Sequence, residues 1–213
     1  MNDLSVVEAL IGYVFADKRL LETALTHSSF VNEHAVAGNE RIEFLGDCVL
    51  NFVVGEKLFF DDPAVGEGKL SARRAAIVSR GPLSRLVDEL GLIKYLRVGA
   101  GVNKSDFSDK ARSDLLEAVI GAVYVDGGLD ACRDVLDNIF FGKVKPERDY
   151  KSELQELAGA RGAIVAYTTS EEATGFCAEV TVGENRFFGR GKTKHSAQID
   201  AARAAVSSLN SKR

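Results

Sequence analysis

The chain has 213 residues, 46% of them hydrophobic, and a formal net charge of −4. This length and composition favour one medium or two small globular domains and exclude a disordered chain. No apolar run reaches the roughly 20 residues that cross a bilayer, and no basic segment precedes an apolar core at the N-terminus, so neither membrane insertion nor secretion is expected. Cys48, Cys132 and Cys177 are far apart, which argues against disulfides or zinc and favours a cytoplasmic protein.

Charge is distributed unevenly along the chain. From residue 150 onward there are 9 Lys and Arg against 7 Asp and Glu, whereas the preceding part has 18 against 24. This asymmetry indicates two parts with different tasks. Between them, Gly142 and Pro146 interrupt the helical pattern. We therefore expect a first domain at 1–141, a linker at 142–149 and a second domain at 150–213.

Before the linker, apolar residues recur at three- and four-residue spacing, which is typical of amphipathic helices. Helices are expected at 4–15, 18–27, 40–60, 67–80, 81–92, 111–128 and 129–141. After the linker, helical segments at 149–159 and 195–209 flank β-rich runs at 164–170, 176–182 and 185–191. The expected fold class is an all-α domain followed by a small α+β domain of order α-β-β-β-α.

The segment NERIEFLGDCVL places carboxylates in a run that otherwise resembles the inside of a protein. At about 100° per residue, Glu40, Glu43 and Asp47 fall in one stripe roughly 60° wide. The other positions are mostly apolar, with Arg41 as the other charge, so we expect the helix to be buried on nearly all sides. A solvated acidic face is the common alternative, but the segment offers no broad polar face.

The segment SDLLEAVIGAVYV repeats this arrangement with Asp114 and Glu117, which are i, i+3 neighbours on an otherwise apolar helix. Buried carboxylates that face one another repel, and they need a cation between them. Lys or Arg could serve, but no basic residue is expected on either acid stripe. Because oxygen ligands favour Mg²⁺ or Mn²⁺ over zinc or copper, a hard divalent metal site is expected. Its expected ligands are Glu43, Asp47, Asp114 and Glu117.

A di-iron carboxylate bundle would also place acids on facing helices. Such a site uses Glu-x-x-His repeats. The histidines of this chain are His27, His34 and His195, and none of them follows a core acid by three residues. This alternative is therefore disfavoured.

Several blocks together resemble one family. NERIEFLGD, with a D-x-x-E pair further along, is similar to the signature of bacterial ribonuclease III. ALTHSSFVNE, EGKLSARRAAIVS and SDLLEAVIGAVYVDGG resemble further blocks of that family in the same order. The C-terminal part, from DYKSELQE to GRGKTKHSAQIDAARAA, resembles a double-stranded-RNA-binding domain. The resemblance covers nearly the whole chain.

The resemblance implies an endoribonuclease that hydrolyses phosphodiester bonds of double-stranded RNA and leaves 5′-phosphate and 3′-hydroxyl ends. It implies the same four metal ligands as the burial argument, with Mg²⁺ as cofactor and Mn²⁺ as a substitute. Among them, Asp47 and Glu117 are expected to be catalytic. The hydrolysis needs no nucleophilic side chain, because a metal can activate water and stabilise the departing oxygen.

Other positions match the family less decisively. Glu40 and Glu67 match acids near the catalytic valley and are expected to be accessory, with a salt bridge or a solvated position as the alternative. Phe44 matches the aromatic residue that seats in the partner subunit, with plain core packing as the alternative. His27 and Ser28 belong to the THSS block, and a capping or core hydrogen bond is the expected role for them.

In the C-terminal domain, the resemblance implies RNA contacts at the start of the last helix and on the first helix. The matching residues are Ser152, Gln155, Lys192, Thr193, Lys194 and His195. This chain departs from the family pattern twice. His195 stands where a second lysine is expected after Thr193, and the loop SEEATG between the first two strands contains two acids and lacks Gly-Pro-x-His. Both departures are expected to weaken RNA contacts.

A homodimer is expected, because a duplex has two-fold axes and a dimer can present identical sites to both strands. Processing of ribosomal RNA precursors and structured messenger RNA is implied by the family. Two other functions remain open: a catalytically silent RNA-binding relative, and a metal enzyme that does not act on RNA. The retention of all four acids favours the active endoribonuclease.

Overall fold

The computed structural model describes residues 4–144 and 148–210. The chain divides into two compact units, Met1–Glu147 and Arg148–Arg213, and each is described here by itself. The proposed linker at 142–149 spans this boundary, and its residues 145–147 lie outside the described ones. Within the described part of the chain, no helix combines the length and the hydrophobicity that a transmembrane segment requires.

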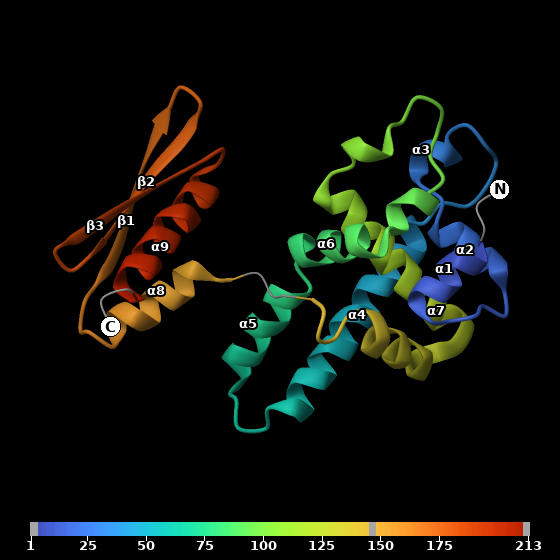
Figure 1. Ribbon diagram of the computed structural model, residues 1–213, viewed down its shortest axis with the longest axis horizontal. Helices are drawn as coiled ribbons and strands as arrows, with labels where there is room; N and C mark the ends of the chain where they lie inside the picture. Colours follow the sequence, from blue (N-terminus) through green and yellow to red (C-terminus); the bar gives the residue numbers. More distant parts are fainter. Residues whose placement is uncertain (1–3, 145–147, 211–213) are drawn as a thin grey trace. The chain divides into compact units, whose positions relative to one another are not determined.

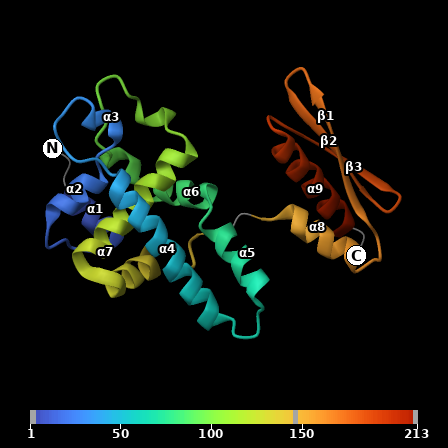
Figure 2. The ribbon, with the colours of Figure 1, turned by 180° about the vertical axis from the view of Figure 1, so that it is seen from behind.

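The elements of the first unit's described part are all helices (Figures 1 and 2), as predicted, apart from an isolated β-bridge. Its elements are α1 (Leu4–Ile11), α2 (Lys18–Ala24), α3 (Ser28–Val31), α4 (Glu40–Asp61), α5 (Glu67–Ile77), α6 (Arg80–Leu90), the 3-10 helices η1 (Leu92–Tyr95) and η2 (Lys104–Asp106), and α7 (Asp109–Ile139). The short helices α3, η1 and η2 were not predicted, because a single turn contains too few residues to show a period. The helix predicted at 18–27 ends early, since Thr26 forms a parallel β-bridge with Arg97.

The predicted helices at 111–128 and 129–141 are joined in α7 without an intervening loop. The backbone of Gly128 lies at φ 77° and ψ −167°, so the helix kinks sharply there. A left-handed φ of this kind is readily adopted by glycine. The N-terminal half of α7 can therefore carry the acids, while the C-terminal half turns back to complete the core.

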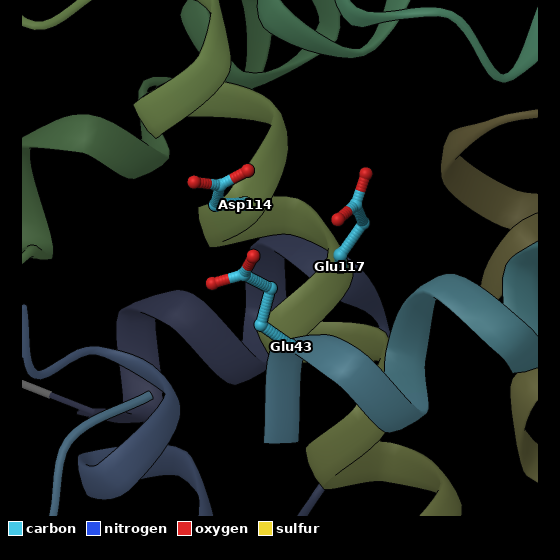
Figure 3. A group of neighbouring side chains, drawn as sticks. All are labelled: Glu43, Asp114 and Glu117. Atoms are coloured by element: carbon cyan, nitrogen blue, oxygen red, sulfur yellow. The ribbon is translucent and has the colours of Figure 1, made fainter. Parts of the chain in front are cut away.

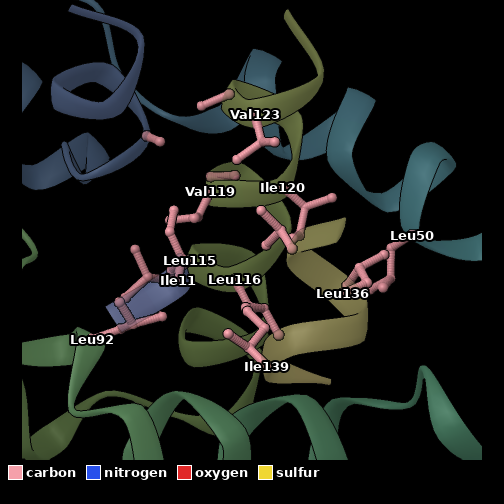
Figure 4. Close-up of a cluster of buried hydrophobic side chains, with 14 of the residues drawn as sticks. Ile11, Leu50, Leu92, Leu115, Leu116, Val119, Ile120, Val123, Leu136 and Ile139 are labelled. Carbon is pink, nitrogen blue, oxygen red and sulfur yellow. The ribbon is translucent and has the colours of Figure 1, made fainter. Parts of the chain in front are cut away.

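The core of the first unit surrounds α7 (Figure 4). Its labelled members include Leu115, Leu116, Val119, Ile120 and Val123, all on the N-terminal half of that helix. They are buried together with Ile11 of α1, Leu50 of α4 and Leu92 of η1. Burial of a large aliphatic side chain contributes about 1.5–3 kcal/mol. This packing holds α7 in place against the helices around it.

Helices α4 and α7 approach each other at a pair of glycines. A Cβ atom at Gly46 would lie 1.7 Å from the carbonyl oxygen of Glu117, and one at Gly121 would lie 2.2 Å from the carbonyl oxygen of Ile42. Neither distance is compatible with a side chain, so glycine at both positions permits the close contact. The crossing lies directly beside the acids of both helices.

The second unit has the predicted order: α8 (Tyr150–Gly159), β1 (Val165–Glu172), β2 (Gly175–Val182), β3 (Asn185–Gly191) and α9 (Lys194–Asn210). The strands form one antiparallel sheet in the order β1-β2-β3. Ala178, Val180 and Val182 of β2 are buried with Ala201 and Val206 of α9. The predicted fold class is thus confirmed for both units.

The loop predicted at 170–175 is shorter than expected. Glu171 and Glu172 belong to β1, where they pair with Phe176 and Gly175 of β2. The turn itself consists of Ala173 and Thr174. Paired strands satisfy the backbone of both acidic residues, so their low intrinsic preference for strands does not decide the local structure.

Candidate functional site

Three of the predicted metal ligands meet where α4 and α7 cross (Figure 3). Glu43 comes from α4, and Asp114 and Glu117 come from α7. Each can offer one carboxylate oxygen such that the three atoms lie within 4.8 Å of one another. All three residues are half-buried. They line an open cavity of about 960 Å³. Spacing of i, i+3 on α7 and the glycine crossing to α4 bring them together.

Asp47, the fourth predicted ligand, lines the same cavity but lies outside this group of three. It is exposed, and its Oδ1 accepts a hydrogen bond of 2.8 Å from the side-chain amide of Asn51. Its charge still acts on Glu117, as the electrostatics of the cluster show. The structure therefore places Asp47 at the edge of the candidate site.

The environment of the cluster penalises negative charge. The pKa of the Glu117 carboxyl is raised from its ordinary 4.5 to about 7, mainly by burial and then by the charges of Asp47 and Asp114. The pKa of Glu43 is raised as well, again mainly by burial and then by Asp114. Carboxyl groups whose ionised form is disfavoured in this way gain from a bound cation.

The cluster already contains one cationic side chain, that of Lys110, which was not predicted from the sequence. The Lys110 ammonium lies 2.5 Å from Oδ2 of Asp114 and 4.0 Å from Oε1 of Glu43. The hydrogen bond to Asp114 is the main cause of the raised pKa of Lys110. The prediction that no basic residue lies on the acid stripes was therefore wrong. The i, i+4 spacing of Lys110 and Asp114 was the signal that could have revealed it.

The prediction that α4 is buried on nearly all sides was also wrong. Val49, Leu50, Val53 and Val54 are buried, but Phe44 is 74% exposed and Phe52 is 53% exposed. The helix is thus apolar on two sides, and the first unit covers only one of them. Core packing within this chain, the alternative considered for Phe44, does not describe its position.

The remaining predicted residues of the first unit are spread around the cluster. Glu40 is exposed and lines a second cavity of about 350 Å³ together with His27 and Ser28. His27 caps α3, because the backbone N–H of Ser29 donates to its Nδ1 at 3.2 Å, which confirms the expected capping role. Glu67 lies in the first turn of α5, where it accepts a hydrogen bond from the Ser71 hydroxyl. Glu67 does not line either cavity.

In the second unit, the predicted RNA contacts at the start of α9 are all exposed. They are Lys192, Thr193, Lys194 and His195. Thr193 and Ser196 cap the helix reciprocally: the Ser196 N–H donates to the Thr193 hydroxyl at 3.1 Å, and the Thr193 N–H donates to the Ser196 hydroxyl at 3.0 Å. This geometry fixes the turn that carries both lysines and points it toward solvent.

The predicted contacts on α8 are exposed too. The Ser152 hydroxyl donates to Asp149, the N-cap of α8, at 2.6 Å, and Gln155 follows one turn later. Lys151, which was not predicted, donates to Gln198 of α9 at 3.0 Å. That bond links the N-terminal parts of α8 and α9 within the same unit.

Comparison with known proteins decides the family. A model of ribonuclease-III-like domains matches residues 17–144, and a model of the double-stranded RNA binding motif matches residues 150–209. Ribonuclease 3 of Dehalococcoides mccartyi is 38% identical, over 97% of this chain and 94% of that protein. Ribonuclease 3 of Enterococcus faecalis is 37% identical, over 93% of this chain and 94% of that protein. This chain belongs to the ribonuclease III family.

The crystal structure of the nuclease domain of ribonuclease III from Campylobacter jejuni supports the same assignment. Its sequence is 34% identical, and the alignment covers 68% of this chain and 100% of that domain, with a TM-score of 0.61. Within the ribonuclease III family, the helical unit of this chain corresponds to the nuclease domain and the α-β-β-β-α unit to the RNA-binding motif. The predicted family resemblance is thus confirmed in both parts.

Proposed function

We propose that this chain is a homodimeric endoribonuclease that hydrolyses double-stranded RNA with Mg²⁺ as cofactor. The observation that carries the proposal is the convergence of Glu43, Asp114 and Glu117, whose carboxylates come from two helices of a ribonuclease-III-like domain to within 4.8 Å. A double-stranded RNA binding motif follows in the same chain. One unit therefore offers a site for the reaction and the other a means of holding the substrate.

The residues of the cluster fit a hard divalent ion. All donors are carboxylate oxygens, which Mg²⁺ and Mn²⁺ prefer, and the raised pKa values of Glu43 and Glu117 reflect negative charge in need of a cation. Glu43, Asp114 and Glu117 would hold the ion directly, and Asp47 would join from the edge of the cavity. When bound, the ion supplies charge that activates water and stabilises the phosphate oxygens.

Acidic side chains of the first unit are proposed to take part in the hydrolysis. Water attacks phosphorus, the bond to the 3′-oxygen breaks, and the products are a 5′-phosphate and a 3′-hydroxyl. Glu117 and Asp47 are the proposed catalytic residues, because both carboxylates border the cavity. Glu117, whose pKa is about 7 in the metal-free cluster, would give up its proton near neutral pH when it binds the cation and would then serve as an ionised ligand. Glu40, which borders the neighbouring cavity, is proposed as accessory, and Glu67 as a more distant accessory residue.

RNA affinity is assigned to the second unit. Lys192 and Lys194 flank Thr193 at the start of α9, where their exposed charges and the positive end of the helix dipole can hold phosphates. His195 follows directly. Ser152 and Gln155 on α8 are proposed to contact the 2′-hydroxyls of the minor groove.

The dimer is proposed from the uncovered apolar side of α4. Phe44, Phe52, Phe59 and Phe60 are all more than half exposed. A cavity of about 470 Å³ lies between α4 and α5 and is lined by Phe52, Phe59 and Leu70, among others. An exposed aromatic side chain and an apolar cavity on one surface suit a self-complementary two-fold interface. Phe44 of a second copy is the proposed occupant. Sedimentation that shows only a 23.0 kDa species at micromolar concentration would contradict this.

A catalytically silent RNA-binding relative is the second candidate function. The retention of all four acids beside one cavity favours the active enzyme. The test is to incubate the full chain with duplex and with single-stranded RNA, with and without Mg²⁺. We expect cleavage of the duplex only, with Mg²⁺ only. Tight binding of duplex RNA without cleavage at any Mg²⁺ or Mn²⁺ concentration would favour the silent relative.

The cellular setting is proposed from the same family membership. We place the enzyme in the cytoplasm, where it would process precursors of ribosomal RNA and structured regions of messenger RNA. Sequencing of RNA ends in cells with and without the active protein would test this. Accumulation of uncut ribosomal precursors is expected without it.

A further inference from the structure

Lys110 occupies an unusual place among the acids of the cluster. Its ammonium group bridges two of the proposed ligands, at 2.5 Å from Asp114 and 4.0 Å from Glu43. The Lys110 side chain is 57% exposed, whereas the side chains of Asp114 and Glu43 are 20% and 24% exposed. The carboxylates are therefore held by the packed helices, while the cation reaches them from solvent on a flexible stem.

The ammonium and a divalent ion would use the same carboxylates. Asp114 and Glu43 both belong to the group whose oxygens lie within 4.8 Å of one another. A metal at that place would stand next to the ammonium, and two cations so close repel. Lys110 and the metal are thus alternative partners of these carboxylates.

The cavity offers a second position for the displaced ammonium. Arg80, at the first turn of α6, lines the same cavity as Lys110, and its positive charge acts on the Lys110 ammonium. Ser79 and Ser108 line the same cavity. Away from the carboxylates, Lys110 would therefore join Arg80 on a cationic wall, and such a wall suits a phosphate group.

We propose that Lys110 is a positioning residue that exchanges partners. Without metal it is the resident cation of Asp114 and Glu43; a divalent ion displaces it, and it then helps Arg80 to hold a phosphate of the RNA beside the metal. The inference rests on the proposed function for its substrate, but its first half concerns the metal alone. It predicts that Lys110 opposes metal binding and favours RNA binding.

The first test measures Mn²⁺ binding to the full chain by calorimetry or electron paramagnetic resonance, without RNA. Lys110→Met keeps most of the length of the unbranched side chain and removes the charge. We expect it to bind Mn²⁺ about five-fold more tightly, because the metal no longer has to displace the ammonium from the carboxylates, and two unit charges about 4 Å apart attract each other by about that factor even in water. Lys110→Arg keeps the charge and should stay within about two-fold of the parent. Unchanged or weaker binding by Lys110→Met would overturn the proposal.

A matched control comes from the preceding 3-10 helix. Lys104 donates a hydrogen bond to the carbonyl oxygen of Lys94 and does not line the cavity of the cluster. Lys104→Met removes the same charge from the same segment, and it should leave Mn²⁺ affinity unchanged. An equal gain in Lys104→Met would attribute the effect to overall charge and overturn the proposal.

The second test follows duplex RNA cleavage at saturating Mg²⁺. We expect Lys110→Met to raise KM several-fold, and Lys110→Arg to restore it. Tighter metal binding together with poorer substrate binding is a combination that local damage to the fold would not produce. An unchanged KM would overturn the second half of the exchange. If no variant cleaves RNA, the proposed function fails, but the Mn²⁺ titration still decides whether Lys110 and metal compete.

Discussion

The carboxylate cluster lies half-buried on the long helices α4 and α7, whereas the basic residues at the start of α9 lie exposed on a capped turn. The first region penalises the charge that it carries, as the raised pKa values of Glu43 and Glu117 show. The second region exposes its charged side chains to solvent, so these charges carry little desolvation penalty. A reacting group has to be held in place before the substrate arrives, while a phosphate contact has only to be within reach. The cluster thus suits the reaction, and the start of α9 suits contact with phosphates.

The largest effect is expected from Glu117→Gln. This change keeps the shape of the side chain but removes a ligand charge, so cleavage should fall by on the order of a hundred-fold or more at ordinary Mg²⁺, partly recovered by excess metal. Duplex binding through Lys192 and Lys194 should persist. Single-turnover cleavage and a gel shift measure the two effects separately. Glu89→Gln, on the exposed side of α6, is the control and should behave as the parent. Parental cleavage across a Mg²⁺ titration would remove Glu117 from the site.

The close packing of α4 against α7, which holds the carboxylate cluster in place, can be disrupted where the two helices cross. Gly46→Ala would place a Cβ atom 1.7 Å from the carbonyl oxygen of Glu117, so α4 and α7 must separate. We expect the free energy of unfolding to fall by about 3 kcal/mol. Metal affinity should fall as well, since the ligands of the two helices move apart. Thermal unfolding and Mn²⁺ titration measure these losses.

Gly68→Ala on α5 is the matched control for that change, because a Cβ atom there meets nothing within 4 Å. It should leave stability unchanged or raise it by up to about 1 kcal/mol, owing to the better helix propensity of alanine. If both variants lose the same stability, the close approach of α4 and α7 does not position the site.

On the exposed side, the double change of Lys192 and Lys194 to Ala should weaken duplex binding by about ten-fold at physiological salt. It should also lower the slope of log affinity against log salt by about 2, because two phosphate contacts are lost. Arg203→Ala, further along α9 and paired with Asp200, is the control. His195→Lys should tighten binding, because it adds a lysine charge directly beside Lys194. An unchanged salt slope in the double variant would place the RNA surface elsewhere.

A further prediction concerns the pH dependence of stability. The folded pKa of Glu117, about 7, lies above its ordinary 4.5, so the folded protein binds this proton more tightly than the unfolded chain does. In the absence of metal, stability should therefore fall as pH rises from about 4.5 to about 7, and the half-saturating Mg²⁺ concentration should fall over the same range. Melting temperatures in a chelator across this pH window measure the first trend. Glu117→Gln should flatten it, and an equally steep curve in that variant would assign the trend to other groups.

The sequence was sufficient to predict the fold class and to single out carboxylates on two apolar helices. Helical periods and the spacing of Asp114 and Glu117 are local properties of the chain. The sequence was insufficient where the outcome depends on two distant segments. Which side of α4 faces solvent depends on the segments that pack against this helix. The sequence alone therefore predicted a helix buried on nearly all sides, whereas Phe44 on that helix is 74% exposed. The exposed position of Asp47, at the edge of the cluster, has the same origin.

Lys110 shows a second limit of prediction from the sequence. Its spacing to Asp114 could be read from the sequence, but its approach to Glu43 depends on how α4 and α7 cross. The glycines at that crossing, Gly46 and Gly121, are recognisable in the sequence, yet nothing local says that they face each other. A pairwise contact of this kind becomes visible only in the folded structure.

The central claim is that Glu43, Asp114 and Glu117 together hold the metal on which cleavage depends. Anomalous X-ray diffraction from crystals of the full chain grown with Mn²⁺ tests it most directly, because the Mn²⁺ position is located independently of the protein atoms. The account predicts an anomalous peak at bonding distance from carboxylate oxygens of all three residues, with the Lys110 ammonium moved away from Asp114. A fully loaded crystal whose peaks lie elsewhere, with Lys110 still bound to Asp114, would contradict it.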